Sequence, residues 1–284
     1  MADAKKISKT KKVGGQKKIS ARRPSSTRKK PRVMATWKYI TISTLITIGA
    51  LALAYRPILR PAFNRFTTCN GHKIYGACIP KGYSVYGIDV SHHQGEIDWK
   101  RLKRGTPNEP PISFVYIKAT EGSDHNDTRF EKNWDNAKNN NFLCGAYHYF
   151  STTSSGKAQA ELFISKVNLE PGDLPPMVDI EDEPDNATEY KEELKNFICL
   201  LENHYKVKPL IYTYRKFHDK YINDVFFNDY PLWIAQYNVT KPGITNEWTM
   251  WQCTKNGKLP GIGHKVDINI FNGSIEELNS LVIK

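Results

Sequence analysis

Short apolar runs rich in β-branched and aromatic residues alternate with longer amphipathic stretches from residue 85 onward. Eight runs have the length and composition typical of strands, at residues 85–90, 112–119, 142–150, 175–181, 208–214, 231–237, 247–253 and 265–271. A helical pattern follows each of the first five runs, at residues 97–104, 128–140, 155–167, 187–205 and 216–224. Little helix separates the last three.

This alternation predicts an α/β fold, because strands that alternate with helices form parallel βαβ units. Five such units followed by three bare strands indicate a closed barrel whose last third has lost its helices. An open, doubly wound sheet is the competing fold. The sequence contains no glycine-rich phosphate loop that would favour it.

A different pattern precedes this domain: residues 39–55 carry no charge, and Lys38 and Arg56 flank them. Seventeen residues are at the short end of what spans a bilayer, and long basic side chains at both ends can reach the interface. We predict an uncleaved transmembrane signal anchor. A cleaved signal peptide is the alternative, because Ala52-Leu53-Ala54 offers small residues, but a leading region of 38 residues is longer than usual.

The net charge is concentrated in residues 1–38, which hold fourteen Lys or Arg and one Asp, whereas residues 39–284 hold 27 basic and 28 acidic residues. We expect a disordered cytoplasmic tail, with the following domain exported to the periplasm or the exterior. The tail can contact anionic lipid head groups or nucleic acid. A nucleic-acid-binding domain would itself be basic, so no nucleic-acid partner is required.

Five cysteines complete the organisation of the chain. Cys69 and Cys78 bracket a short loop within a predicted linker, residues 56–83, and we predict a disulfide between them; two free thiols are the alternative. Cys144, Cys199 and Cys253 lie in apolar contexts typical of buried thiols. Neither cysteine nor histidine spacing suits a metal, and we predict no metal or cofactor.

The candidate chemistry centres on Asp179 and Glu181, two residues apart at the end of an apolar run. On a strand both carboxyl groups leave the same face, roughly 7 Å apart. Burial and mutual repulsion raise the pKa of such a pair, which keeps one carboxyl protonated near neutral pH and able to act as a general acid. The alternative is that both begin a solvated acidic loop, residues 181–185.

Other strand ends carry acids, aromatic residues and amides that would converge on one face of a barrel, where active sites lie. Aromatic faces and hydrogen-bonding side chains together are typical of sugar sites, although each aromatic residue is as readily explained as core. The residues at these ends are Asp89, Lys118, Tyr147, Tyr149, Trp233, Tyr237, Trp251, Gln252 and Asp267.

Several blocks of the sequence resemble one known family, glycoside hydrolase family 25, the N-acetylmuramidase lysozymes. They include YGIDVSHHQGEIDW (86–99), YIKATEG (116–122), GAYHYF (145–150), MVDIE (177–181), YPLWIAQY (230–237) and WQCTKNGKLPGIGHKVDINIFNG (251–273). The resemblance implies a TIM-like (β/α)5(β)3 barrel over residues 84–284, cleaving the β-1,4 bond between N-acetylmuramic acid and N-acetylglucosamine in peptidoglycan. The family's functional acids fall on Asp89, Asp179, Glu181 and Asp267.

On this basis Glu181 is the expected general acid, and Asp179 is expected to assist through the substrate's acetamido group, with retention of configuration. In the rival mechanism Asp179 or Asp89 activates water directly, with inversion. Two other functions compete: a membrane-tethered sugar-binding protein that has no turnover, and a chitinase-like hydrolase.

Overall fold

The computed structural model describes residues 33–54 and 71–284. The chain divides into two units, residues 1–67 and 68–284. Most of the predicted basic tail lies outside the described residues, as do Cys69 and the first part of the predicted linker. The predicted disordered state of the tail, its lipid contact and the Cys69–Cys78 disulfide therefore stay predictions.

In the first unit, residues Val33–Ala54 form a single helix, α1. The helix covers residues 39–54 of the predicted apolar segment and begins six residues before residue 39. Within residues 33–54 and 71–284, no helix is both long enough and apolar enough to cross a membrane. The predicted transmembrane helix thus receives no support from the described part of the chain.

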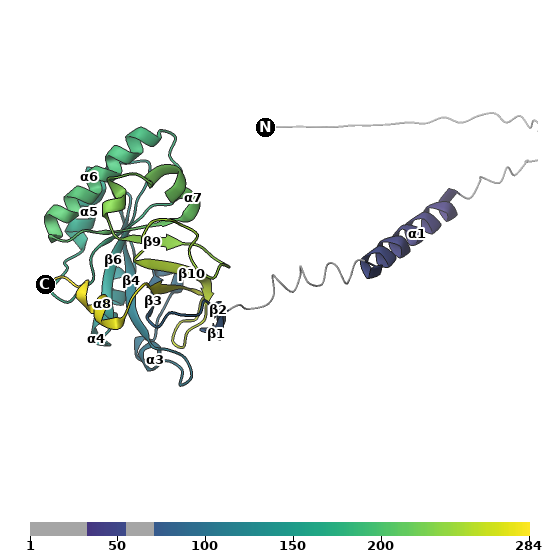
Figure 1. Ribbon diagram of the computed structural model, residues 1–284, viewed down its shortest axis with the longest axis horizontal. Coiled ribbons are helices and arrows are strands. Elements are labelled where there is room, and N and C mark those ends of the chain that lie inside the picture. The colour runs from purple at the N-terminus through teal and green to yellow at the C-terminus, as the bar shows by residue number, and fades with distance from the viewer. Residues whose placement is uncertain (1–32, 55–70) are drawn as a thin grey trace, which may run out of the picture. The chain divides into compact units, whose positions relative to one another are not determined.

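The second unit is built on a closed barrel of eight strands, and β3 pairs with both β11 and β4 (Figure 1). The strands are β3 (Tyr86–Val90), β4 (Ile112–Glu121), β6 (Leu143–Tyr149), β7 (Met177–Asp179), β8 (Leu210–Tyr214), β9 (Leu232–Ala235), β10 (Met250–Gly257) and β11 (Val266–Phe271). The first seven are parallel, and β11 is antiparallel to both of its neighbours. All eight predicted strands are confirmed.

Helices follow the first five strands, as predicted: α3 (Trp99–Arg104), α4 (Phe130–Asn139), α5 (Gly156–Lys166), α6 (Ala187–Tyr205) and α7 (Arg215–Phe217), which continues as a π-helical turn (His218–Ile222). Side chains that accept from backbone N–H groups begin several of them, such as Ser155 for α5 and Asn186 for α6. Between β9 and β11 the structure has loops, and α8 (Ile275–Ser280) follows the barrel. The barrel whose last third lacks helices is confirmed.

Smaller elements fell outside the prediction. β1 (His72–Ile74) and β2 (Ala77–Ile79) form a hairpin, so this part of the predicted linker belongs to the barrel unit. Tyr75 at its turn is buried and donates a hydrogen bond to the Pro110 carbonyl at 2.8 Å. The others are β5 (His125–Asn126), the helix α8 and two 3-10 turns, His92–Gln94 and Phe227–Asp229.

The barrel interior is packed with aromatic side chains. Phe114, Tyr116 and Trp233 are fully buried there and meet edge to face, with ring centroids 4.9–6.5 Å apart. Gly87 and Gly145 provide the space for these rings, because a Cβ at either position would lie within 2.4 Å of the Phe114 or Tyr116 ring. The filled interior confines the open space to the end of the barrel.

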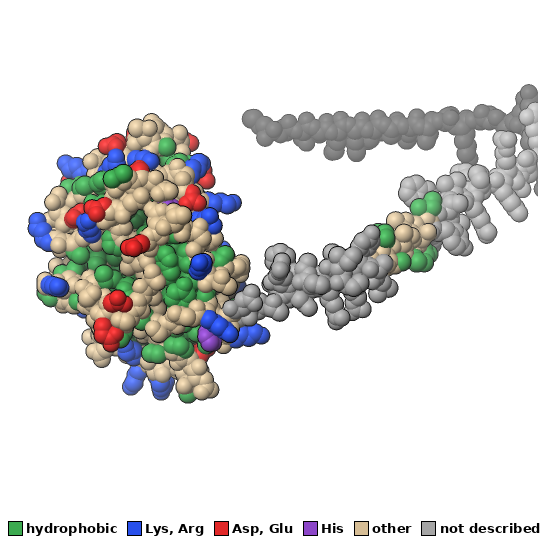
Figure 2. Space-filling view, viewed as in Figure 1, with side chains coloured by type: hydrophobic (Ala, Val, Ile, Leu, Met, Phe, Trp, Pro, Cys, Tyr) green, Lys and Arg blue, Asp and Glu red, His purple; other side chains and the backbone are tan. Residues whose placement is uncertain are grey.

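The surface of the barrel unit carries both signs of charge. Figure 2 shows Lys and Arg side chains interspersed with Asp and Glu side chains over the face in view. This mixture agrees with the near balance of charges counted from residue 39 onward.

Candidate active site

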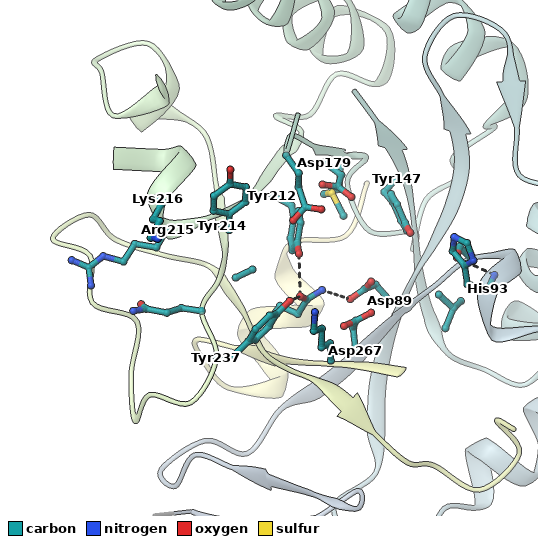
Figure 3. A pocket seen from close by; sticks show the side chains of 18 of the residues that line it. Asp89, His93, Tyr147, Asp179, Tyr212, Tyr214, Arg215, Lys216, Tyr237 and Asp267 are labelled. Atoms are coloured by element: carbon teal, nitrogen blue, oxygen red, sulfur yellow. Dashed lines mark hydrogen bonds between the residues drawn. The ribbon is translucent and has the colours of Figure 1, made fainter. Parts of the chain in front are cut away.

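A cavity of about 890 Å³ opens at the end of the barrel where the parallel strands terminate (Figure 3). Its wall includes all four predicted acids and three of the seven predicted substrate-binding residues. The predicted residues that line it are Asp89, Tyr147, Asp179, Glu181, Tyr237, Gln252 and Asp267. The convergence expected from the strand order therefore occurs.

The strand register brings two of the acids face to face. Asp89 near the end of β3 pairs directly with Asp267 on β11. Because β11 runs antiparallel, Asp267 lies near the start of its strand and still reaches the same end of the barrel. Directly opposed residues of an antiparallel pair have Cβ atoms about 4.5–5.5 Å apart, so their charges interact strongly.

Asp89 is held by two amides. Gln252 Nε2 and Asn269 Nδ2 donate to Asp89 Oδ2 at 3.1 and 2.8 Å. Burial raises the pKa of Asp89, and these two hydrogen bonds, which favour the charged form, oppose that rise. The net pKa stays above the ordinary value.

A chain of hydrogen bonds fixes the orientation of those amides. Gln252 Oε1 accepts from the hydroxyls of Tyr212, at 3.0 Å, and Tyr237. Trp233 Nε1 donates to Asn269 Oδ1 at 3.2 Å. Since both amide oxygens are occupied as acceptors, both amide nitrogens are directed as donors toward Asp89.

Asp179 is less well satisfied. Among the described residues no group donates a hydrogen bond to its buried Oδ1. Burial, followed by the charges of Glu181 and Asp89, raises the pKa of Asp179 well above its ordinary value, and Lys118 only partly offsets this rise. An unpaired buried carboxyl oxygen is costly, and here it faces a cavity that a ligand can enter.

Glu181 follows β7 by two residues and is partly exposed in the cavity. Burial raises its pKa, and the charges of Asp89 and Asp182 add to the rise, whereas a hydrogen bond with Tyr212 and the charge of Lys255 lower it. A carboxyl with a raised pKa can donate a proton to a leaving oxygen near neutral pH.

Asp267 behaves similarly. Burial, then the charges of Asp89 and Glu181, raise the pKa of Asp267 to about 8. The four carboxyl groups therefore share fewer negative charges than four isolated acids would carry at neutral pH. Such a set offers a proton donor and a carboxylate in one cavity, and hydrolysis of a glycosidic bond requires these two groups.

Two predicted substrate contacts are core residues instead. Trp233 is fully buried inside the barrel. Trp251 is fully buried outside it, against Tyr83 and Trp248, and donates to the Gln236 carbonyl at 2.8 Å. Side chains of a strand alternate between the two faces of the sheet. The sequence does not show which face a given tryptophan takes or how deep in the barrel it lies, so a place on a strand did not distinguish core from cavity.

Lys118 and Tyr149 also lie away from the cavity wall. Lys118 is buried, pairs with Glu121 at 2.6 Å and has its Nζ 4.8 Å from the centroid of the Tyr149 ring. The Tyr149 hydroxyl donates to Asp182 Oδ1 at 2.7 Å. Lys118 nevertheless acts on the site electrostatically, because its charge lowers the pKa of Asp179.

Sequence reasoning missed several residues of the cavity wall, and the strand-end argument would have found some of them. Tyr212 and Tyr214 end β8, and Arg215 and Lys216 follow directly, by the same rule that identified Asp179. His93 lies in the turn after β3. Figure 3 shows His93 at one end of the cavity and Arg215 and Lys216 at the other.

Comparison with known proteins agrees with this geometry. Residues 88–262 match the sequence profile of glycosyl hydrolases family 25. The chain is 37% identical over 212 residues to the uncharacterized protein YegX of Escherichia coli K12, covering 74% of this chain and 78% of that protein. It is 35% identical over 213 residues to Lysozyme M1 of Streptomyces globisporus, covering 69% and 71%.

Solved structures show the same likeness. A family 25 glycosyl hydrolase from Bacillus anthracis superimposes with a TM-score of 0.63 at 36% identity, covering 70% of this chain and 94% of that one. The profile match spans more than half of the chain and includes Asp89, Asp179 and Glu181. The chain belongs to glycosyl hydrolases family 25 and is a glycoside hydrolase.

Proposed function

We propose that this chain is a muramidase, which hydrolyses the β-1,4 bond between N-acetylmuramic acid and N-acetylglucosamine in peptidoglycan. The observation that carries the proposal is the cavity lined by Asp89, Asp179, Glu181 and Asp267, with burial raising the pKa of each. Its similarity to Lysozyme M1 supports the choice of substrate.

Glu181 is the general acid of this proposal. It is the acid that reaches into the cavity beyond the end of β7, and its raised pKa keeps a proton available for the leaving oxygen. Removing a positioned general acid slows catalysis by about 10²–10⁴-fold. Once Glu181 has lost its proton it can serve as base toward an incoming water.

Asp179 acts on the 2-acetamido group of the muramic acid. Its unpartnered Oδ1 offers an acceptor for the acetamido N–H, and this hydrogen bond would lower the pKa of Asp179. The resulting negative charge raises the pKa of Glu181 beside it and keeps the proton on the acid. The oriented acetamido oxygen then attacks the anomeric carbon while the glycosidic oxygen leaves with the proton of Glu181. Water, deprotonated by Glu181, then attacks the same carbon and releases the acetamido oxygen, so the two inversions together retain the configuration.

Asp89 and Asp267 adjust these charges and bind sugar hydroxyls. The charge of Asp89 contributes to the raised pKa of Glu181 and of Asp267, and the amides of Gln252 and Asn269 keep Asp89 in place. Tyr147 and Tyr237 line the same cavity and offer aromatic faces to pyranose rings.

The test is digestion of purified peptidoglycan by the full chain, with the new reducing ends identified by mass spectrometry. Reducing-end N-acetylmuramic acid is expected. Cleavage of chitin but not of peptidoglycan would instead indicate the chitinase-like alternative. Intact glycan that sediments together with the protein would replace turnover by the non-catalytic sugar-binding function.

The stereochemistry is tested separately, by NMR of the first product formed. The proposed route gives the β-anomer before mutarotation. An initial α-anomer would replace it with direct attack of water, with Asp179 or Asp89 as base.

The place of action follows from the substrate. We propose that the barrel unit works outside the cytoplasm, where peptidoglycan lies, with the N-terminal tail on the cytoplasmic side. The dense positive charge before residue 39 supports this orientation. Protease added to intact spheroplasts should digest the barrel unit, and carbonate extraction should leave the chain in the membrane pellet if residues 39–55 anchor it.

A further inference from the structure

Three cationic residues line the cavity in addition to the acids: Arg215, Lys216 and Lys255. All three are exposed to solvent. Arg215 and Lys216 are consecutive and begin α7 directly after β8, whereas Lys255 comes from β10. Figure 3 shows Arg215 and Lys216 at the opposite end of the cavity from His93, with Asp89 and Asp179 between the two ends.

Lys255 interacts electrostatically with two of the four acids. Its charge lowers the pKa of Glu181 and of Asp267. Neither Arg215 nor Lys216 is among the main contributors to the pKa of any of the four acids. Their charges are therefore available for a different partner.

Within the described part of the chain these two cations are weakly paired. Lys216 forms no ion pair there, and Arg215 meets only Asp219, through Nε, at 3.4 Å. Both members of that pair are about half exposed, so water screens it. The terminal nitrogens of the guanidinium remain suited to bidentate binding of a carboxylate.

We propose that Arg215 and Lys216 form a subsite for a carboxylate of the substrate, which selects acidic glycan strands over neutral ones. This rests on the proposed muramidase function. Muramic acid differs from N-acetylglucosamine by a 3-O-lactyl arm that ends in a carboxylate, or in a peptide with carboxylates of its own. Neutral chitin has no group that would engage these two cations.

Three soluble glycan strands distinguish the source of the carboxylate: strands with peptides, strands freed of peptides by an amidase, and peptide-free strands whose lactyl carboxylates are amidated. In the first the lactyl carboxylate is an amide, so only the peptide carries charge. In the second only the lactyl arm carries charge. The third is neutral. Kinetics of the full-length R215Q/K216Q double variant are measured on all three at low and high salt.

The double variant should lose about 3- to 10-fold in kcat/KM, mainly through KM, on at least one of the two charged strands. It should match the wild type on the neutral strand, and salt should shrink the difference. Loss on the first strand assigns the subsite to the peptide, and loss on the second assigns it to the lactyl arm.

The matched control is K100Q/R101Q, which removes an adjacent exposed Lys-Arg pair on α3 that does not line the cavity. It should match the wild type on every strand. Equal loss by R215Q/K216Q on all three strands, or no loss on any, would overturn the subsite while leaving the muramidase function in place. A wild type inactive on all three strands would overturn both.

Discussion

Two neighbouring residues of β6, Tyr147 and His148, belong to two different polar clusters. The clusters differ in whether their buried polar groups have hydrogen-bond partners. Tyr147 lines the acid-bearing cavity, whereas His148 is fully buried in a second cluster. There Nδ1 lies 2.7 Å from Thr120 Oγ1, and Nε2 lies 2.9 Å from Gln159 Oε1. Because the Gln159 oxygen can only accept, Nε2 carries the proton and Nδ1 accepts from the threonine.

The buried histidine is therefore satisfied at both ring nitrogens. Burial lowers the pKa of His148 to about 4, so the ring stays neutral at physiological pH. It stacks on Phe197 with centroids 4.8 Å apart. By contrast Asp179 has an unpartnered carboxyl oxygen among the described residues, and burial, followed by the acids around it, raises its pKa. A satisfied polar group stabilises the fold, whereas an unsatisfied one at a cavity is available for a ligand.

The Glu181→Gln variant should show the largest effect, a loss of activity from a change in the cavity cluster. Glutamine keeps the shape of the side chain and removes the donated proton, so kcat should fall by about 10²–10⁴-fold. The measurement is turnover on peptidoglycan, with circular dichroism as the control for folding. A folded variant with more than a tenth of the wild-type kcat would remove Glu181 from the role of acid.

An effect of the opposite kind is expected for His148→Ala. It removes the hydrogen-bond partner of Thr120 Oγ1 and one of the two donors to Gln159 Oε1, and it opens a cavity against Phe197, which should cost about 2–4 kcal/mol of unfolding free energy. Urea denaturation measures the loss, and kcat of the folded protein at 20 °C should stay within about 2-fold. Unchanged stability with lost turnover would break the comparison.

The smallest effect concerns Asp267→Asn and its dependence on pH. The folded pKa of Asp267, about 8, exceeds the ordinary value of 3.8, so the folded state binds the proton more tightly than the unfolded chain. This group's contribution to stability therefore falls as pH rises from about 4 to 8. Asparagine carries no such charge.

The variant should accordingly gain stability relative to the wild type as pH increases. A relative gain of at least about 1 kcal/mol between pH 5 and pH 8.5 is expected, equivalent to roughly 2–4 °C in Tm. Thermal unfolding at both pH values measures it. A constant difference across that range would show that Asp267 titrates normally in the folded protein.

The sequence predicted the barrel well because its apolar runs alternate regularly with amphipathic helical stretches. It also placed four acids together, since strand ends of a barrel converge. The hairpin at residues 72–79 was missed because three-residue strands carry little pattern. The antiparallel direction of β11 was also unpredicted, as direction leaves no trace in hydrophobic periodicity.

Individual side chains of the site were harder to predict than its location. In the sequence nothing distinguishes Trp233 and Trp251 from the aromatic residues of the cavity wall. Only their packing shows that they belong to the core. Asn269 joins the site through its hydrogen bond to Asp89, which no sequence spacing predicts. The unpartnered oxygen of Asp179 is likewise a property of the folded surroundings.

The most direct test of the account is the Asp179→Asn variant, with kcat on peptidoglycan and the urea unfolding midpoint measured on the same preparation. If the unsatisfied carboxyl serves the reaction, kcat should fall at least about 100-fold while the midpoint holds or rises, because asparagine replaces a carboxyl group whose ionisation is opposed by burial and by the neighbouring acids. Wild-type turnover, or a loss of turnover that merely follows unfolding, would contradict the claim that Asp179 is kept unpaired for the substrate.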